Sequence, residues 1–271
     1  MPNRDLIPFL GFTDPFSSLV HLAVLVVFAL LARTLLEGAR RDPQRLLASR
    51  LFLLCCPAMY LCSVVYHALP NDSAWRPLFW HLDHGAIWLA LASCLSCAQA
   101  TFFGRWSWGP VWRRILWGLA LTGCALELTV LSRYPGVFDW VSPLLYVGIG
   151  WMGFPMVLAM WTRKARARRV VATLLFVGGL FATVGGIVDA LAWPTLVPRV
   201  VEAHECMHVL TGTAGVWWIT PHWIAARDAI ANARVAGPAA SGSGALAPTP
   251  AAGARPWRAP ASRSASTRRA R

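Results

Sequence analysis

The residues of this sequence best suited to chemistry are histidines and one carboxylate set within long apolar stretches. His204 and His208 are four residues apart, as are Ser63 and His67, so each pair projects from one face of a helix. Three neutral imidazoles with one position left for water form a catalytic zinc site, and a nearby carboxylate can accept a proton from that water. We therefore predict Zn²⁺ held by His67, His204 and His208, with Asp83 and Ser63 as candidate catalytic residues.

The run H-E-C-M-H at residues 204–208 also fits the H-E-x-x-H pattern of zinc metalloproteases. The next histidine, His222, follows His208 by 14 residues, which is about 21 Å along a continuous helix. It cannot reach the same ion, whereas His67 can do so from another helix. Glu205 points roughly 100° away from the histidine face, so we place it at the open end of the helix or in a pair with a neighbouring side chain. It is a candidate for contacting a ligand histidine rather than the metal.

Four further polar residues in apolar stretches need a partner or a function, because an ionisable group in lipid costs several kcal/mol. His84 flanks Asp83 at the membrane edge, where a structural role is favoured, although it can also hydrogen-bond within the site. Glu127 and Asp189 either orient the ligating histidines or anchor helix contacts. His21 belongs to the same polar set and is a further candidate behind the ligands.

The composition predicts an all-α membrane protein. The chain has 271 residues, of which 56% are hydrophobic and 14% charged, with 15 Trp, and apolar stretches of about 20 residues match the thickness of a bilayer. We expect a seven-transmembrane-helix bundle over residues 16–224, after an N-terminal segment at 1–15. The seven stretches are 16–36, 51–69, 79–100, 111–131, 141–161, 170–191 and 203–224.

The polar residues fall on one side of this predicted bundle. Odd-numbered stretches start on the side of the N-terminus and even-numbered ones end there. The residues near those ends are His21, Ser63, His67, Asp83, Glu127, Asp189, His204 and His208. Such alignment across six helices indicates a shared polar layer rather than scattered structural histidines.

The distribution of the basic residues that give the formal charge of +13 indicates membrane topology rather than nucleic-acid binding. Four arginines fall on the side of the N-terminus, and 21 basic residues fall on the other side. The positive-inside rule predicts an N-terminus outside the cell and a cytoplasmic C-terminus. Residues 225–271, rich in Ala, Pro, Gly, Ser and Arg, are expected to form a basic disordered cytoplasmic tail.

Four segments carry a resemblance to a known family. They are Asp14-Pro15-Phe16 through His21-Leu22, then C-S-V-V-Y-H at 62–67, L-D-H-G-A-I at 82–87 and H-E-C-M-H at 204–208. They resemble the motifs of the hemolysin III and progestin/adipoQ receptor family, over roughly residues 12–224. The pattern extends to the alkaline ceramidases in a wider group of membrane hydrolases, but L-D-H-G-A-I favours the hemolysin III branch.

The resemblance implies zinc held by His67, His204 and His208, with Asp83 contacting a water on the metal and Ser63 nearby. It also implies, for the receptor branch, an N-terminus inside the cell, whereas the ceramidase branch has it outside. The charge distribution of this chain favours an N-terminus outside the cell. We expect the protein in a bacterial cell membrane.

Three functions follow as expectations. The favoured one is a zinc-dependent hydrolase of a lipid amide or ester, with membrane lipids as its partners and substrate source. The second is a receptor-like or sensor protein whose zinc only ties helices together. The third is a pore-forming cytolysin, which receives little support because a water-filled path needs polar residues through the full membrane depth.

Overall fold

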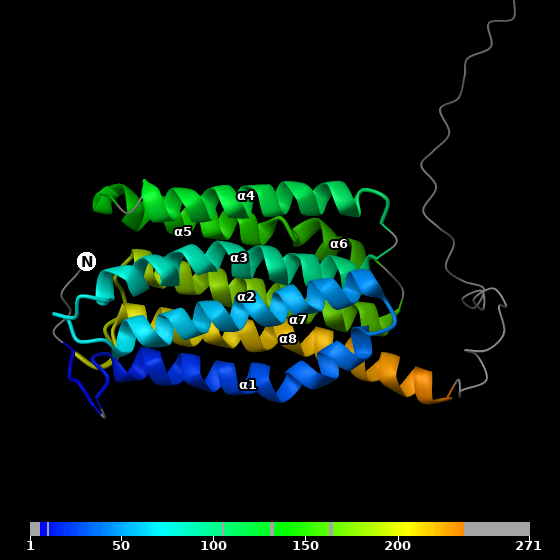
Figure 1. Ribbon diagram of the computed structural model, residues 1–271, viewed down its shortest axis with the longest axis horizontal. Coiled ribbons are helices and arrows are strands. Elements are labelled where there is room, and N and C mark those ends of the chain that lie inside the picture. Colours follow the sequence, from blue (N-terminus) through cyan, green and yellow to red (C-terminus); the bar gives the residue numbers. More distant parts are fainter. Residues whose placement is uncertain (1–5, 10, 105, 131–132, 163–164, 236–271) are drawn as a thin grey trace, which may run out of the picture. The chain divides into compact units, whose positions relative to one another are not determined.

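The computed structural model describes residues 6–9, 11–104, 106–130, 133–162 and 165–235. Within them the fold is all-α, as predicted (Figure 1). The helices are α1 (Pro15–Ala39), α2 (Pro43–Ala68), α3 (Arg76–Phe102), α4 (Gly109–Thr129), α5 (Pro135–Trp151), α6 (Phe154–Trp161), α7 (Arg166–Ala190) and α8 (Ala203–Val235). Helix α8 thus continues past residue 224, where we expected the last apolar stretch to end.

Five helical segments of the described chain are long and apolar enough to cross a membrane. They are α1, α2, α3, α7 and the stretch Val141–Trp161, which joins most of α5 to α6. Large apolar side chains on these helices face outward, such as Leu30, Leu54 and Leu144, which are 73%, 65% and 69% exposed. Outward apolar faces suit a hydrocarbon environment, and the chain is an integral membrane protein.

The first two helices begin in the same way. Asp14 and Asp42 are the N-cap residues, and Pro15 and Pro43 follow them at the first helical position. Proline fits there because its missing N–H needs no partner in the first turn, and the aspartate side chain accepts a backbone N–H. The Asp-Pro pairs therefore set where α1 and α2 start.

The fifth predicted stretch is broken into α5 and α6. Helix α5 ends at Trp151 and α6 begins at Phe154, with Gly153 as its N-cap and Pro155 in its first turn. Proline cannot donate a hydrogen bond to the preceding turn and its ring crowds the carbonyl four residues back, which explains the break.

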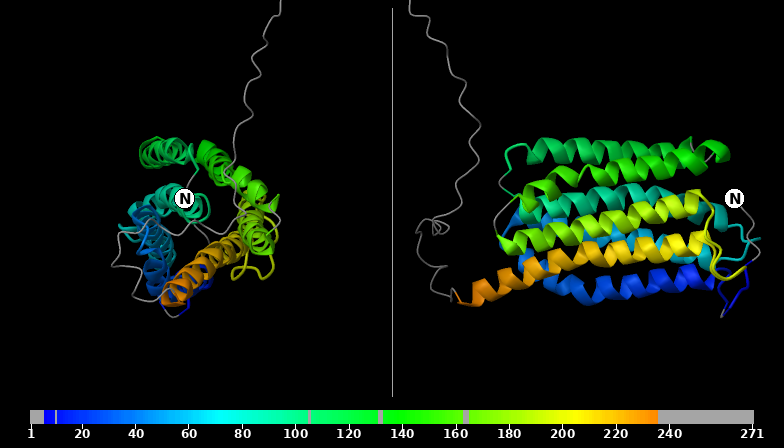
Figure 2. Two further views of the ribbon diagram at one scale, coloured as in Figure 1. Left: turned by 90° about the vertical axis from the view of Figure 1, so that its right-hand side faces the viewer. Right: turned by 180° about the vertical axis from the view of Figure 1, so that it is seen from behind.

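Helix α8 lies close to α1 and α7, which brings together segments far apart in the sequence (Figure 2). A Cβ atom on Gly212 of α8 would lie 3.1 Å from Val20 and 3.2 Å from Val24 of α1, and one on Gly185 of α7 would lie 3.2 Å from Thr211 of α8. Small residues allow such close backbone approach in membranes. The N-terminal ends of α1 and α8 and the C-terminal ends of α2 and α7 lie at one end of the bundle (Figure 1).

Candidate metal centre

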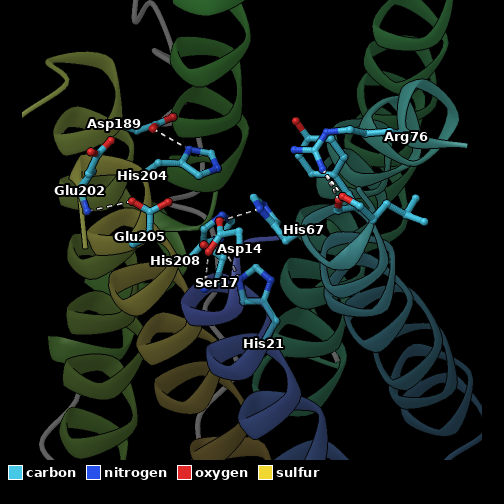
Figure 3. A network of polar contacts seen from close by, with 12 residues as sticks. Asp14, Ser17, His21, His67, Arg76, Asp189, Glu202, His204, Glu205 and His208 are labelled. Atoms are coloured by element: carbon cyan, nitrogen blue, oxygen red, sulfur yellow. Dashed lines mark hydrogen bonds and ion pairs between the residues drawn. The ribbon is translucent and has the colours of Figure 1, made fainter. Parts of the chain in front are cut away.

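Three histidines converge at this end of the bundle (Figure 3). His67 lies in the last turn of α2, and His204 and His208 lie in the first two turns of α8. A ligand nitrogen of each lies within 4.8 Å of the others. His67 and His208 are buried and His204 is half-buried. The three predicted ligands are therefore close enough to hold a metal ion.

Two of these imidazoles have a carboxylate at Nδ1. The Nδ1 of His67 lies 2.9 Å from Oδ2 of Asp14, and the Nδ1 of His204 lies 2.8 Å from Oδ1 of Asp189. A ligating histidine commonly donates its second ring N–H to a carboxylate, which fixes the ring and its tautomer. Asp189, which the sequence left open between two roles, thus contacts a candidate ligand.

The third imidazole has another histidine at Nδ1. The Nδ1 of His208 lies 3.1 Å from Nε2 of His21, and the rings meet edge to face. With every Nδ1 engaged in this way, Nε2 is the ring nitrogen that each histidine would offer to a metal. His21, on α1, therefore touches the candidate site as a partner of a ligand.

Asp14 reaches His67 because the segment before α1 runs along the end of α2. The backbone N–H of Asp14 donates to the carbonyl of His67 at 2.9 Å, and that of Thr13 donates to the carbonyl of Ala68 at 3.4 Å. Oδ1 of Asp14 accepts the backbone N–H of Ser17 at 3.1 Å. Burial by itself would raise the pKa of Asp14, but His67 and Ser17 together hold this pKa below its ordinary value.

Asp14 was missing from the residues predicted for the site. It precedes the first apolar stretch, so a search for polar residues within apolar stretches passes over it. The signal that could have found it is the Asp14-Pro15 pair, which places a carboxylate at the start of a helix on the same side as His67.

Arg76 holds the end of α2 that carries His67. Its Nη1 donates to the carbonyl of Leu69 at 2.6 Å and to that of Tyr66 at 3.2 Å, and its guanidinium lies 4.6 Å from the centre of the Tyr66 ring. A cation is favourable at a helix C-terminus, where carbonyls lack partners within the helix. This contact stabilises the turn that presents His67.

Glu205 serves the start of α8. Its Oε2 accepts the backbone N–H of Glu202 at 2.9 Å, while Oε1 of Glu202 accepts the backbone N–H of Arg199 at 3.1 Å. A glutamate at the third helical position that reaches back to the N-cap is one half of a capping box. Because Glu205 is fully buried, this contact helps to fix the turn that carries His204 and His208.

Asp83 and Ser63, the candidate catalytic residues, lie on two helices that pack against each other. Both are buried, Asp83 on α3 and Ser63 one turn before His67 on α2. Both side chains line the same cavity as the three histidines. His84, the next residue on α3, donates from Nδ1 to the carbonyl of Trp80 at 2.8 Å.

Glu127 lies in a separate polar cluster. Its carboxylate accepts hydrogen bonds from Trp88 of α3 at 3.3 Å and from Ser142 and Tyr146 of α5 at 3.2 and 2.8 Å. The hydroxyl of Tyr146 also lies 3.3 Å from the carbonyl of His84. In the described part of the chain, Glu127 therefore joins α4 to α3 and α5 rather than contacting a candidate ligand.

The site opens into a cavity of about 1220 Å³. The carboxylates and imidazoles lie at one end, and the rest of the wall is mostly apolar. The polar lining includes Asp14, His21, Ser63, His67, Asp83, His84, Asp189, His204 and His208. The apolar lining includes Phe28, Phe52, Leu95, Val157, Phe176 and Trp218.

The fold and the site define an integral membrane protein with a three-histidine candidate metal centre at one end of an apolar cavity. Residues 11–219 match the family model described as Haemolysin-III related, and the chain belongs to this family. The family resemblance seen in the sequence motifs is thereby confirmed.

Proposed function

We propose that this protein is a zinc-dependent membrane hydrolase that cleaves the amide or ester bond of a lipid. The observation that carries the proposal is the convergence of His67, His204 and His208 at the polar end of a largely apolar cavity. A metal centre beside an apolar chamber is suited to a substrate with one polar bond and a long hydrocarbon part.

The donor set fits zinc. Three imidazoles are a frequent protein ligand set for catalytic zinc, which keeps a fourth position open. Each candidate ligand also has a partner at Nδ1, namely Asp14, Asp189 or His21. Bound zinc supplies Lewis-acid polarisation of a carbonyl and a nucleophile from water near neutral pH.

Asp83 and Ser63 are the groups of this chain that we assign to proton transfer and orientation. Asp83 accepts the proton of the attacking water on a carboxylate oxygen and passes it to the leaving group. Ser63 donates its hydroxyl to the oxygen on which negative charge develops. Both line the cavity together with the three histidines.

The apolar arm of the cavity takes an acyl chain and excludes water from it. On α8 the wall runs from His204 to Trp218, and on α7 from Asp189 to Phe176, spans of about 21 and 20 Å at 1.5 Å per residue. An arm of this length matches an extended long-chain acyl group, which places the bond to be cleaved near the histidines.

We further propose seven membrane crossings, with α5 and α6 together forming one, and an N-terminus outside the cell. The charge distribution supports this topology, since 21 of the 25 basic residues fall opposite the N-terminus. The site then opens toward the outer face.

The decisive experiment is hydrolysis of a panel of lipid amides and esters by zinc-loaded protein, with Asp83→Asn as the test variant. We expect Asp83→Asn to keep its zinc and to lose activity by about 10²- to 10⁴-fold, the usual contribution of a general base. Asp72→Asn, in the exposed loop between α2 and α3, is the control and should keep full activity. Zinc-loaded wild type that cleaves no member of the panel contradicts the proposal and favours a zinc ion that only ties helices together.

A further inference from the structure

The partner of the third candidate ligand differs from the other two. His67 and His204 each face a carboxylate at Nδ1, whereas His208 faces Nε2 of His21 at 3.1 Å. An ionised carboxylate accepts hydrogen bonds and donates none, whereas a neutral imidazole has one donor nitrogen and one acceptor nitrogen. The two rings of the His208–His21 pair must therefore divide these roles between them.

Metal coordination decides that division. This inference rests on the proposed zinc site. A neutral histidine that offers Nε2 to a metal carries its proton on Nδ1, so His208 is the donor in this pair and Nε2 of His21 is the acceptor. A neutral His21 must then carry its own proton on Nδ1.

The Nδ1–H of His21 thus becomes a buried donor that needs an acceptor. The His21 side chain is 4% exposed and lines the cavity. Among the described residues its Nδ1 meets no hydrogen-bond partner, and the same holds for the fully buried hydroxyl of Ser18, which lies on the same helix face three residues earlier. A buried water commonly satisfies two or more such groups at once.

We propose that His21 is a positioning residue for the metal centre. It accepts the Nδ1–H of His208, which fixes the ring and tautomer of that ligand, and it donates its own Nδ1–H to a water shared with Ser18 at the polar end of the cavity. The chain of hydrogen bonds extends the metal site onto α1, the helix whose N-cap, Asp14, already orients His67.

The test compares zinc affinity and the visible spectrum of the cobalt(II)-substituted protein in two variants. In His21→Gln the side-chain carbonyl can still accept the His208 N–H, whereas in His21→Leu it cannot. We expect zinc affinity, measured by chelator competition, to fall about 10- to 100-fold in His21→Leu and to stay within a few-fold of wild type in His21→Gln. The cobalt bands should shift in the first variant and persist in the second.

His222→Leu is the matched control. His222 is as buried as His21, at 2% exposure, but it contacts Cys97, Phe52 and Phe102 and is absent from the cavity wall. Its loss should leave zinc affinity and the cobalt spectrum unchanged. Equal effects of His21→Leu and His222→Leu, or failure of His21→Gln to retain affinity, overturn the proposal.

A measurement on the wild type covers the case in which His21→Leu does not fold. Nitrogen NMR of ¹⁵N-histidine-labelled, zinc-loaded protein, assigned with His21→Gln, reports which ring nitrogen is protonated. The proposal requires the Nδ1–H tautomer at His21, and the Nε2–H tautomer overturns it. Wild type that binds no zinc removes the proposed function itself, whereas zinc binding with the wrong tautomer removes only this inference.

Discussion

The carboxylate beside Nδ1 of His67 belongs to Asp14, which is also the N-cap of α1. Oδ2 of Asp14 lies 2.9 Å from Nδ1 of His67, and Oδ1 accepts the backbone N–H of Ser17. One side chain therefore sets both the position of α1 and the orientation of a ligand on α2. Loss of such a partner typically lowers metal affinity by about 10- to 100-fold.

The two Asp-Pro helix starts allow the roles of Asp14 to be separated. Asparagine is about as good an N-cap as aspartate, so Asp14→Asn and Asp42→Asn should both fold with little change in thermal stability. Only Asp14→Asn removes the charge beside His67, and we expect it to weaken zinc binding by about 10-fold or more. Chelator competition on both variants measures this. Equal zinc affinities in the two variants would show that Asp14 acts only as a cap.

The residues of the site were partly predictable. The spacing of His204 and His208, and the depth they share with His67, pointed to their convergence because helical periodicity and membrane depth are both readable from sequence. Asp14 was not predictable in this way, since its contact with His67 depends on how the segment before α1 crosses the end of α2.

Glu127 was left open between orienting a ligand and anchoring helices, and its hydrogen bonds to Trp88, Ser142 and Tyr146 favour anchoring. In Glu127→Gln one acceptor oxygen becomes an amide donor that faces the donors already present. Leaving such groups unsatisfied costs about 1–3 kcal/mol. We expect a lower unfolding temperature in detergent with unchanged zinc content. A variant of normal stability that has lost zinc would place Glu127 at the metal centre instead.

Among the helices, α7 shapes the cavity wall. The cavity-lining residues of α7 recur every three to four positions, the spacing of one helix face. They include Asp189, Gly186, Thr183, Ala182, Gly179 and Phe176. Small residues thus lie between the polar Asp189 and the bulky Phe176 along this wall of the arm.

Gly179→Leu tests whether the apolar arm of the cavity binds an acyl chain, and Gly148→Leu is the matched control. A Cβ atom at either glycine would meet nothing within 4 Å, yet only Gly179 lines the cavity. A leucine at position 179 should keep about two methylenes of a long acyl chain from being buried, which weakens binding by roughly 1.6 kcal/mol. We expect kcat/KM for the longest substrates to fall about 10-fold relative to short ones, and no change in Gly148→Leu. A uniform effect on all chain lengths would contradict an acyl-binding arm.

Helix boundaries were less predictable than helix existence. Helix α2 begins at Pro43 rather than near residue 51. Asp42 and Pro43 start it within a polar segment, which a search for apolar stretches leaves out. The break between α5 and α6 falls inside a continuous apolar stretch, where Gly153 and Pro155 override composition.

The topology of the entire chain decides which face of the membrane the site serves. The charge distribution predicts a cytoplasmic C-terminus, so a C-terminal green fluorescent protein fusion should fluoresce and a C-terminal alkaline phosphatase fusion should be inactive. The reverse result would place the histidines at the cytoplasmic face, and the substrate would then come from the inner leaflet.

The metal content of purified protein is the measurement to make first. Elemental analysis should find about one zinc per chain in the wild type and in His222→Ala, whose imidazole is buried away from the cavity. It should find none in His67→Ala or His208→Ala, since each removes one of three convergent ligands. Wild type that carries no zinc and cannot be loaded with it, or equal zinc in all four proteins, would contradict a metal centre at the three histidines.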